Sequence, residues 1–353
     1  MNAYKKWGIG VVTGILVSLL VFAGSIAIVD PFAQYHLPWF SMLPIFSRDT
    51  QAYVNPGMAK NYDYDSVLIG SSVSENFSAS MVDKLFDCHT VKLPFAGGSS
   101  KNYEMILDVA LQKHTLKNVF YSVDMFGLTS DPDTPRNNPV PEYLYNTNIF
   151  DDVSYLLNKA VFFHYAGDMV KQNIQGDIVS YNKAYNWENE HSFSQERVLK
   201  QYNRPAQSNT QTAANSFFAN IDRSIENLSR IIKNNPNTTF YVFYPPYSVI
   251  QYDSYLREGS FDALCNGYKH SMEKWLSFEN VEVYSFINIE HIITNLDLYR
   301  EMMHFSEAVN AYMVMNMADG NFRITKENCA NEISAFRKFI LDYDFSEYFG
   351  TES

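Results

Sequence analysis

The segment of residues 8–29 constrains how this chain can fold more than any other feature, because it contains no charged side chain. At about 1.5 Å per residue, a helix of this length spans the roughly 30 Å hydrocarbon core of a bilayer. Lys5 and Lys6 precede the segment, Trp7 stands at its start, and Asp30 ends it. The pattern predicts a cytoplasmic tip and transmembrane anchor in residues 1–29, with the rest of the chain outside the cell membrane.

A cleaved signal peptide is the alternative interpretation of this segment. Signal peptides have an apolar core of about 7–15 residues that ends at a cleavage site with small residues. The sequence Ala23-Gly-Ser-Ile-Ala27 has the small residues of such a site, but the apolar run is longer than a signal peptide requires. We therefore favour an uncleaved single-pass anchor that embeds in the lipid bilayer.

The charge of the remaining chain restricts its partners. Residues 30–353 carry 25 of the 27 basic residues and all 39 acidic ones, a net charge of −14. A chain this acidic is not suited to hold nucleic acid by charge.

Cys265 and Cys329 either pair or remain thiols together with Cys88, since three cysteines are too few for a disulfide framework. The sequence has no metal-ligand spacing and no phosphate-cradling glycine motif, so we expect no metal and no cofactor.

The rest of the chain shows an alternation of short apolar runs and helical patterns. Residues 30–63 lack clear periodicity and are expected to form a tether and cap. Residues 64–353 are expected to form an α/β domain with an insertion at about 125–215. The alternation predicts a parallel five-stranded sheet flanked by helices. The expected strands are 66–69, 90–95, 118–124, 238–244 and 281–286, and the expected helices are 75–86, 101–114, 216–233, 261–278 and 307–317.

Polar or glycine residues directly follow the expected strands. The carboxyl ends of parallel strands lie at one edge of a sheet, where ligands gather, so these residues should converge there. Glu301 and His304, on the loop after the last strand, should reach the same edge. The residues that follow the strand ends are Ser71, Ser72, Gly97, Gly98, Asp124, Tyr247 and Ser248.

A serine just past a strand, followed much later by an acid-x-x-His pattern, is typical of a Ser-His-acid triad. A serine hydroxyl becomes a good nucleophile only when an imidazole takes its proton, and the imidazole needs an acid on its other nitrogen. Glu301 can supply that acid to His304 from a single turn. Ser306 is expected to cap the helix that follows and so to anchor this loop.

These motifs together resemble the SGNH (GDSL-type) hydrolases, and the likeness spans most of the chain. The resemblance implies an SGNH-like, flavodoxin-like sheet. The closer similarity is to a membrane-anchored branch that includes DltD of teichoic-acid D-alanylation and the AlgX/AlgJ-type polysaccharide O-acetyltransferases. The motifs that carry it are Gly70-Ser71-Ser72, Gly97-Gly98, Glu301-Met-Met-His304, Asp30-Pro31-Phe32, Pro141-Glu-Tyr-Leu-Tyr145 and Phe243-Tyr-Pro-Pro-Tyr-Ser248.

The resemblance implies a role for each residue of the site. The third residue of the family's glycine-serine block is the nucleophile, which corresponds to Ser72, with His304 and Glu301 completing the triad. The glycine block supplies an oxyanion-hole amide, which corresponds to Gly97 or Gly98.

The chain departs from the family's pattern in two places. Glu301 stands where an aspartate is usual. The usual oxyanion asparagine after the third strand is missing: Asp124 occupies that neighbourhood, and Asn102 is the substitute that the sequence offers.

Several assignments stay open at this point. Ser71 or Ser74 replaces Ser72 as nucleophile if the turn is aligned differently, and Asp297 replaces Glu301 if the loop is longer. Asp124 and Tyr247 are candidates for binding substrate, and Asp124 is equally suited to cap a helix or close a turn.

The resemblance implies a serine acyl-ester hydrolase or O-acyltransferase that handles acetyl or alanyl groups on a cell-surface polysaccharide or teichoic-acid-like polymer. A membrane-bound O-acyltransferase is the partner that such proteins often have. The rival interpretation is a catalytically inactive protein that keeps the fold and binds glycan as a scaffold of a cell-envelope modification complex.

Overall fold

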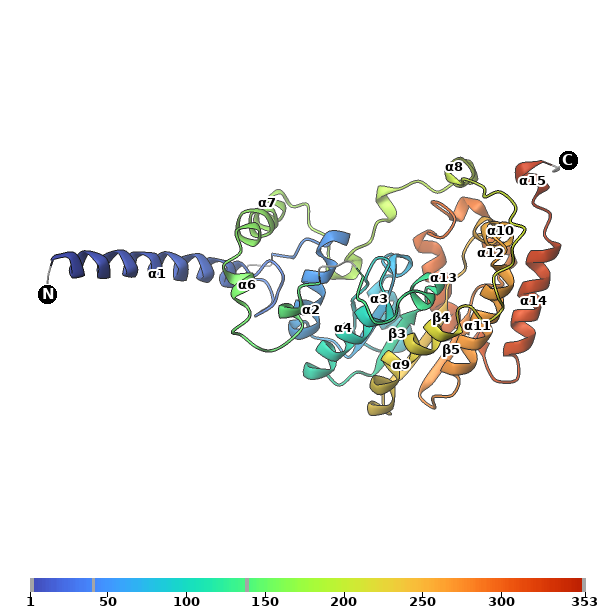
Figure 1. Cartoon of the computed structure of the whole chain (residues 1–353), viewed down its shortest axis with the longest axis horizontal. Helices are drawn as coiled ribbons and strands as arrows, with labels where there is room; N and C mark the ends of the chain where they lie inside the picture. The colour runs from blue at the N-terminus through green and yellow to red at the C-terminus, as the bar shows by residue number, and fades with distance from the viewer. Residues whose placement is uncertain (1–2, 40–41, 137–139, 351–353) are drawn as a thin grey trace. The chain divides into compact units, whose positions relative to one another are not determined.

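The computed structural model describes residues 3–39, 42–136 and 140–350. The chain divides into two compact units, which we call unit 1 (Met1–Tyr62 and Pro139–Ser180) and unit 2 (Asp63–Asn138 and Tyr181–Ser353). Unit 1 contains the long N-terminal helix, and unit 2 contains the sheet (Figure 1).

Unit 2 is built on a sheet with the strand order β2-β1-β3-β4-β5-β6. The first five strands run parallel, in the 2-1-3-4-5 order of flavodoxin-like doubly wound sheets. This confirms the α/β class and the mostly parallel sheet. The strands are β1 (Ser66–Gly70), β2 (Thr90–Lys92), β3 (Asn118–Ser122), β4 (Thr239–Tyr244), β5 (Val281–Ser285) and β6 (Arg323–Ile324).

The expectation of five strands was wrong, because the sheet has six. β6 pairs antiparallel with β5 through Val283 with Ile324 and Tyr284 with Arg323. A strand of two residues has no alternating pattern that could reveal it in the sequence. The connection from β5 to β6 runs through α12 and α13, and a tight turn at Gly320 (φ +72°) then leads from α13 into β6, which runs opposite to β5.

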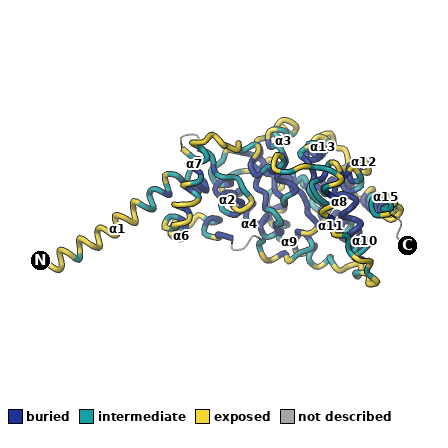
Figure 2. Tube along the Cα trace, turned by 90° about the horizontal axis from the view of Figure 1, so that it is seen from above, coloured by how far each residue is buried: buried dark blue, intermediate teal, exposed yellow. Residues whose placement is uncertain are grey.

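Helices cover both faces of the sheet. On one face α4, α9, α11 and α14 pack in a row, and on the other α3 packs against α13. In Figure 2, α4, α9 and α11 lie on one side of a buried centre and α3 and α13 on the other. Unit 2 contains α3 (Ala79–Phe86), α4 (Ser100–Lys113), α5 (Met125–Thr129), α8 (Gln195–Gln201), α9 (Phe218–Asn234), α10 (Val249–Arg257), α11 (Phe261–Trp275), α12 (Glu290–Ile293), α13 (Glu307–Ala318), α14 (Cys329–Asp342) and α15 (Ser346–Phe349).

The apolar stripe expected on residues 216–233 forms the buried face of α9. Ile221, Ile225 and Leu228 are all at least 96% buried, as the helical period requires. The helix ends at Asn234, two residues before Pro236, because a proline disfavours helical geometry in the residue before it.

Unit 1 begins with α1 (Ala3–Val29), which contains an 18-residue stretch with a mean hydropathy of 2.5 and is long and apolar enough to cross a membrane. A signal sequence near the N-terminus passes the same test of length and composition. The buried carboxylate of Asp30 closes the helix by accepting the N–H groups of Gln34 and Tyr35 and the hydroxyl of Tyr155. Unit 1 also contains α2 (Gln51–Asn61), α6 (Val153–Leu156), η5 (Val161–Ala166) and α7 (Gly167–Gln175).

Candidate active site

The serine turn follows β1 directly, and Gly70 makes it possible. Gly70 has a φ of +152°, and a Cβ there would lie 2.8 Å from the Cβ of Ser122 and 3.0 Å from the Oγ of Ser74. Only glycine fits this backbone and this close approach to β3. Ser72 to Ser74 then form a single 3₁₀ turn, η3 (Ser72–Ser74).

Ser72, His304 and Glu301 lie in one hydrogen-bonded row. The Oγ of Ser72 lies 2.7 Å from the Nε2 of His304, although 232 positions separate the two residues. The Nδ1 of His304 bonds the carboxylate of Glu301, which also accepts the backbone N–H of His304 at 2.8 Å. The histidine side chain is 12% exposed. Chemically, this row can move a proton from the serine to an imidazole that a carboxylate holds in one tautomer.

The other serines of the turn do not contact the histidine. Ser71 is fully buried, and its Oγ has no hydrogen-bond partner among the described residues. The Oγ of Ser74 donates to the backbone oxygen of Ser71 at 2.6 Å. Asp297, the alternative acid, is exposed and accepts the N–H of Gln195.

The charge of Glu301 is stabilised in place. Burial alone would raise its pKa, but the hydrogen bonds and the positive charge of His304 outweigh burial and lower the pKa of Glu301 from its ordinary value of 4.5. A carboxyl with a lowered pKa stabilises the fold above that ordinary value, and the contribution is lost as the pH falls through the lowered pKa.

The loop that carries His304 is closed on itself and tied to the end of β4. An isolated β-bridge joins Tyr299 to Phe305 across the loop. The hydroxyl of Tyr299 donates to the backbone oxygen of Pro246, and Ser248 donates its N–H and its hydroxyl to the backbone oxygen of Met302. The segment after β4 therefore positions the histidine loop.

Trp187 also contacts the row, and sequence analysis missed it. Its indole N–H donates to the backbone oxygen of Ser72 at 3.3 Å, and its ring lies edge-on to the His304 ring at 5.6 Å. The guanidinium carbon of Arg300 lies over the indole ring, 4.9 Å from its centroid. Trp187 stands in a stretch without helical or strand periodicity, so no sequence signal pointed to it.

A glutamate takes the capping role expected of Ser306. Ser306 occupies the N-cap position of α13, but its side chain makes no capping hydrogen bond. The carboxylate of Glu188 instead accepts the N–H of Glu307 at 2.9 Å, so a negative charge lies at the helix N-terminus. Asn310 of the same helix donates to the backbone oxygen of Val73, which ties α13 to the serine turn.

The candidate oxyanion-hole residues Gly97, Gly98 and Asn102 follow β2 in the chain, and each has its own hydrogen-bond environment. The N–H of Gly98 donates to the backbone oxygen of Phe95 at 2.8 Å. Gly97 has a φ of +65°, and no atom lies within 4 Å of where its Cβ would be. The side chain of Asn102 accepts the N–H groups of Ser99 and Arg136 and donates to the backbone oxygen of Arg136, so it caps α4 and holds the next loop.

Asp124 and Tyr247, the candidate substrate-binding residues, bond each other. The hydroxyl of Tyr247 donates to the carboxylate of Asp124 at 2.9 Å, and the same carboxylate accepts the N–H of Phe126 and caps α5. Burial and the negative charge of Asp124 raise the pKa of Tyr247 well above its ordinary value. The pair braces the ends of β3 and β4.

Lys92 supports the serine turn from β2. Its side chain is buried, and its Nζ donates to the backbone oxygens of Glu75 at 2.9 Å and Phe77 at 2.8 Å. Both oxygens belong to the segment just after η3. Burial lowers the pKa of Lys92 to about 7, although the charge of Glu75 opposes that shift. A neutral amine keeps two N–H groups, enough for both carbonyls.

We expect Lys92 to make the stability of the fold depend on pH above 7. Between pH 7 and 10.5 the unfolded chain keeps the proton that the folded chain releases, so the free energy of unfolding should rise with pH by up to about 1.4 kcal/mol per unit. Lys92→Met should remove this slope. Denaturant unfolding in detergent at several pH values gives the free energy of unfolding of the wild type and of Lys92→Met. If the difference between these two free energies stays constant from pH 7 to 10, the prediction is wrong.

The described residues contain no group of three or more His, Cys, Asp and Glu side chains that could hold a metal ion. Cys88, Cys265 and Cys329 are free thiols, and burial raises the pKa of Cys265 to about 12 and of Cys329 to about 11.

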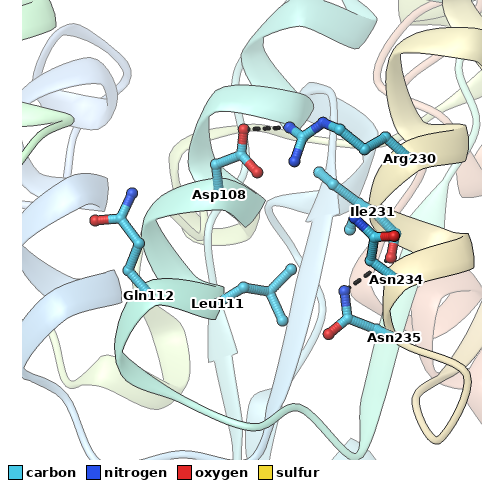
Figure 3. Close-up of a pocket in the computed structure, with 7 residues that line it drawn as sticks. All are labelled: Asp108, Leu111, Gln112, Arg230, Ile231, Asn234 and Asn235. Atoms are coloured by element: carbon cyan, nitrogen blue, oxygen red, sulfur yellow. Dashed lines mark hydrogen bonds and ion pairs between the residues drawn. The ribbon is translucent and has the colours of Figure 1, made fainter.

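A cavity of about 400 Å³ opens between α4 and α9. It includes the ion pair of Asp108 with Arg230 but none of the candidate site residues (Figure 3).

No protein-family model matches the chain, and no curated protein matches its sequence. Among solved structures, a protein from Streptococcus pneumonia described as a candidate platelet activating factor aligns with a TM-score of 0.40 and 12% identity. The alignment covers 77% of this chain and 90% of that one. At this level the similarity establishes neither family nor function. Fold and site together define an α/β protein with a Ser-His-Glu row beside a mostly parallel sheet.

Proposed function

We propose that unit 2 is a serine acyl-ester hydrolase or O-acyltransferase of the SGNH type, with Ser72 as nucleophile, His304 as base and Glu301 as acid. One observation carries the proposal: the Oγ of Ser72 and the carboxylate of Glu301 contact opposite nitrogens of the same imidazole. A serine packed only for structure would not require an imidazole so oriented.

The proposed reaction begins when His304 takes the hydroxyl proton of Ser72. The serine oxygen attacks the acyl carbon and forms a tetrahedral intermediate, which collapses when His304 returns the proton to the leaving alcohol. The acyl group is then an ester on Ser72. Water, or a hydroxyl of a second molecule, attacks that ester with His304 again as base, which gives hydrolysis or transfer.

We assign oxyanion stabilisation to the N–H group of Gly97. The N–H of Gly98 is bonded to Phe95, and the amide of Asn102 is bonded to Ser99 and Arg136. Gly97 is partly exposed, follows β2 and has open space beside its Cα. Its N–H is therefore the best-placed donor in the glycine block.

We further propose that α1 anchors the protein in the cell membrane, with the N-terminus in the cytoplasm and the active site outside. The hydropathy of α1 and the two lysines before it support this orientation. The substrate would be a cell-surface polysaccharide or teichoic-acid-like polymer that carries acetyl or alanyl esters. A membrane-bound O-acyltransferase is the proposed partner that supplies acyl groups.

Labelling with a serine-reactive fluorophosphonate tests the proposed function. We expect the full-length protein in detergent to bind the probe covalently and the adduct to map to Ser72 by mass spectrometry, because its hydroxyl lies within hydrogen-bond reach of an imidazole that a carboxylate holds on the other side. Wild-type protein that neither labels nor cleaves p-nitrophenyl acetate would overturn the catalytic proposal. That outcome would favour the non-catalytic glycan-binding scaffold.

A further inference from the structure

Unit 1 exposes large apolar side chains on α6 and η5, which pack against α1, and on the neighbouring residues 149–150 and α7. We call Ile149, Phe150, Val153, Phe163 and Ile174 the apolar collar, and each is more than half exposed. Solvent-exposed apolar side chains in such number mark a surface that contacts a membrane or another protein. The surroundings of α1 distinguish these two partners.

The helices that carry Val153 and Phe163 contact α1, and Phe22 in its last third is one contact point. α6 and η5 pack on this helix, and the ring of Phe162 stacks on that of Phe22 with centroids 4.7 Å apart. In Figure 2 the tube of α1 is exposed over most of its length and becomes partly buried toward its C-terminal end. Phe22 lies seven residues before Val29, which is about 10 Å along the helix axis.

This contact sets the depth of the collar. If the apolar part of α1 crosses a bilayer, Phe22 lies about 10 Å inside the hydrocarbon boundary, because the helix rises 1.5 Å per residue. The ring of Phe163 contacts that of Phe162 at 4.8 Å, yet Phe163 is 73% exposed. Phe163 is therefore linked to Phe22 through one intervening ring, and its exposed side chain lies beside the buried-to-exposed part of α1 around Phe22.

Trp39 marks the expected boundary of that medium. The Nε2 of His36 lies 3.0 Å from the backbone oxygen of Ala27, near the end of α1. Trp39 stacks on the His36 ring at 4.4 Å and is 50% exposed. A tryptophan at the end of a spanning helix is typical of the membrane–water interface. Trp39 is linked through His36 to Ala27, and Phe163 is linked through Phe162 to Phe22, which lies further into the proposed bilayer along α1.

We propose that the apolar collar of unit 1 inserts into the lipid leaflet at the C-terminal end of α1, so that unit 1 is partly embedded in the membrane rather than only tethered to it. The inference rests on the proposed anchoring by α1. The collar contacts the acyl chains of the leaflet in this proposal, because it continues the apolar surface of α1, which itself requires an apolar environment.

Photolabelling from within the bilayer tests this proposal. The full-length protein is reconstituted in phosphatidylcholine vesicles with a phospholipid that carries a diazirine on its acyl chain, irradiated, digested and analysed by mass spectrometry. We expect adducts on α1 and on the peptides that contain Phe150 and Phe163. The matched reference is the peptide with Leu341, an apolar side chain of unit 2 that is 58% exposed.

The outcomes separate this proposal from the anchor on which it rests. Adducts on α1 without adducts on residues 149–174, or equal labelling of the Leu341 peptide, would overturn the collar while leaving the anchor in place. No adducts on α1 would overturn both. Phe163→Asp should reduce labelling of its own peptide and leave labelling of α1 unchanged, and Leu341→Asp should change neither.

Discussion

Replacing Ser72 with alanine is expected to lower kcat for acetyl-ester hydrolysis by about 10⁴-fold or more, because the acyl group then has no nucleophile to accept it. The cavity left by one hydroxyl is small, and the Ser72 side chain is partly exposed, so the fold should persist. Hydrolysis of p-nitrophenyl acetate by the full-length variant in detergent measures the loss.

Ser71→Ala is the matched control, since it removes the same hydroxyl one residue earlier. The Oγ of Ser71 is buried without a hydrogen-bond partner among the described residues, so its loss should change kcat by no more than a few-fold. If Ser71→Ala abolished activity and Ser72→Ala did not, the nucleophile would be reassigned to Ser71.

Glu301→Gln is expected to lower kcat by about 10²- to 10⁴-fold with little change in KM. Glutamine keeps the size of the side chain but removes the charge that fixes the His304 tautomer and stabilises the imidazolium that forms. The substrate does not need this charge to bind, so the loss should appear in the chemical step. Steady-state kinetics over a range of ester concentrations separate the two parameters.

Two further variants check the assignment of the acid. Glu301→Asp restores the charge on a shorter side chain and should recover part of the activity that glutamine loses. Asp297→Asn removes the charge of the alternative acid, which bonds Gln195 and not His304, and should leave kcat near that of the wild type. Strong loss in Asp297→Asn alone would move the acid to that residue.

The parallel strands and most of the larger helices of unit 2 were readable from the sequence, but α14 (Cys329–Asp342) was not among the expected helices. The apolar runs that form β1, β3, β4 and β5 and the stripe of α9 carry local periodicities, and the structure confirms the mostly parallel α/β sheet. β6 escaped because two residues cannot carry a period and its pairing with β5 is antiparallel. Whether such a short edge strand forms depends more on its pairing with the neighbouring strand than on the pattern of its own residues.

Only part of the candidate site could be predicted from the sequence, because some of its contacts join residues that are far apart in the chain. Ser72, Glu301 and His304 were named from turn position and local spacing, and Glu301 lies close enough in the chain to predict its contact with His304. Trp187 and Lys92 had no such local signal, because both act on the serine turn from elements remote in sequence. Their roles follow from packing alone.

For this protein, local sequence was sufficient for the apolar N-terminal helix, the α/β class and the set of residues that chemistry would favour. Each depends on residues within a few positions of one another, where helix and strand geometry decide which side chains share a face. The folded chain alone decided which of three serines meets the imidazole and that Glu188, rather than Ser306, bonds the start of α13. Such contacts join residues more than a hundred positions apart, and only the packing of the sheet and its helices brings them together.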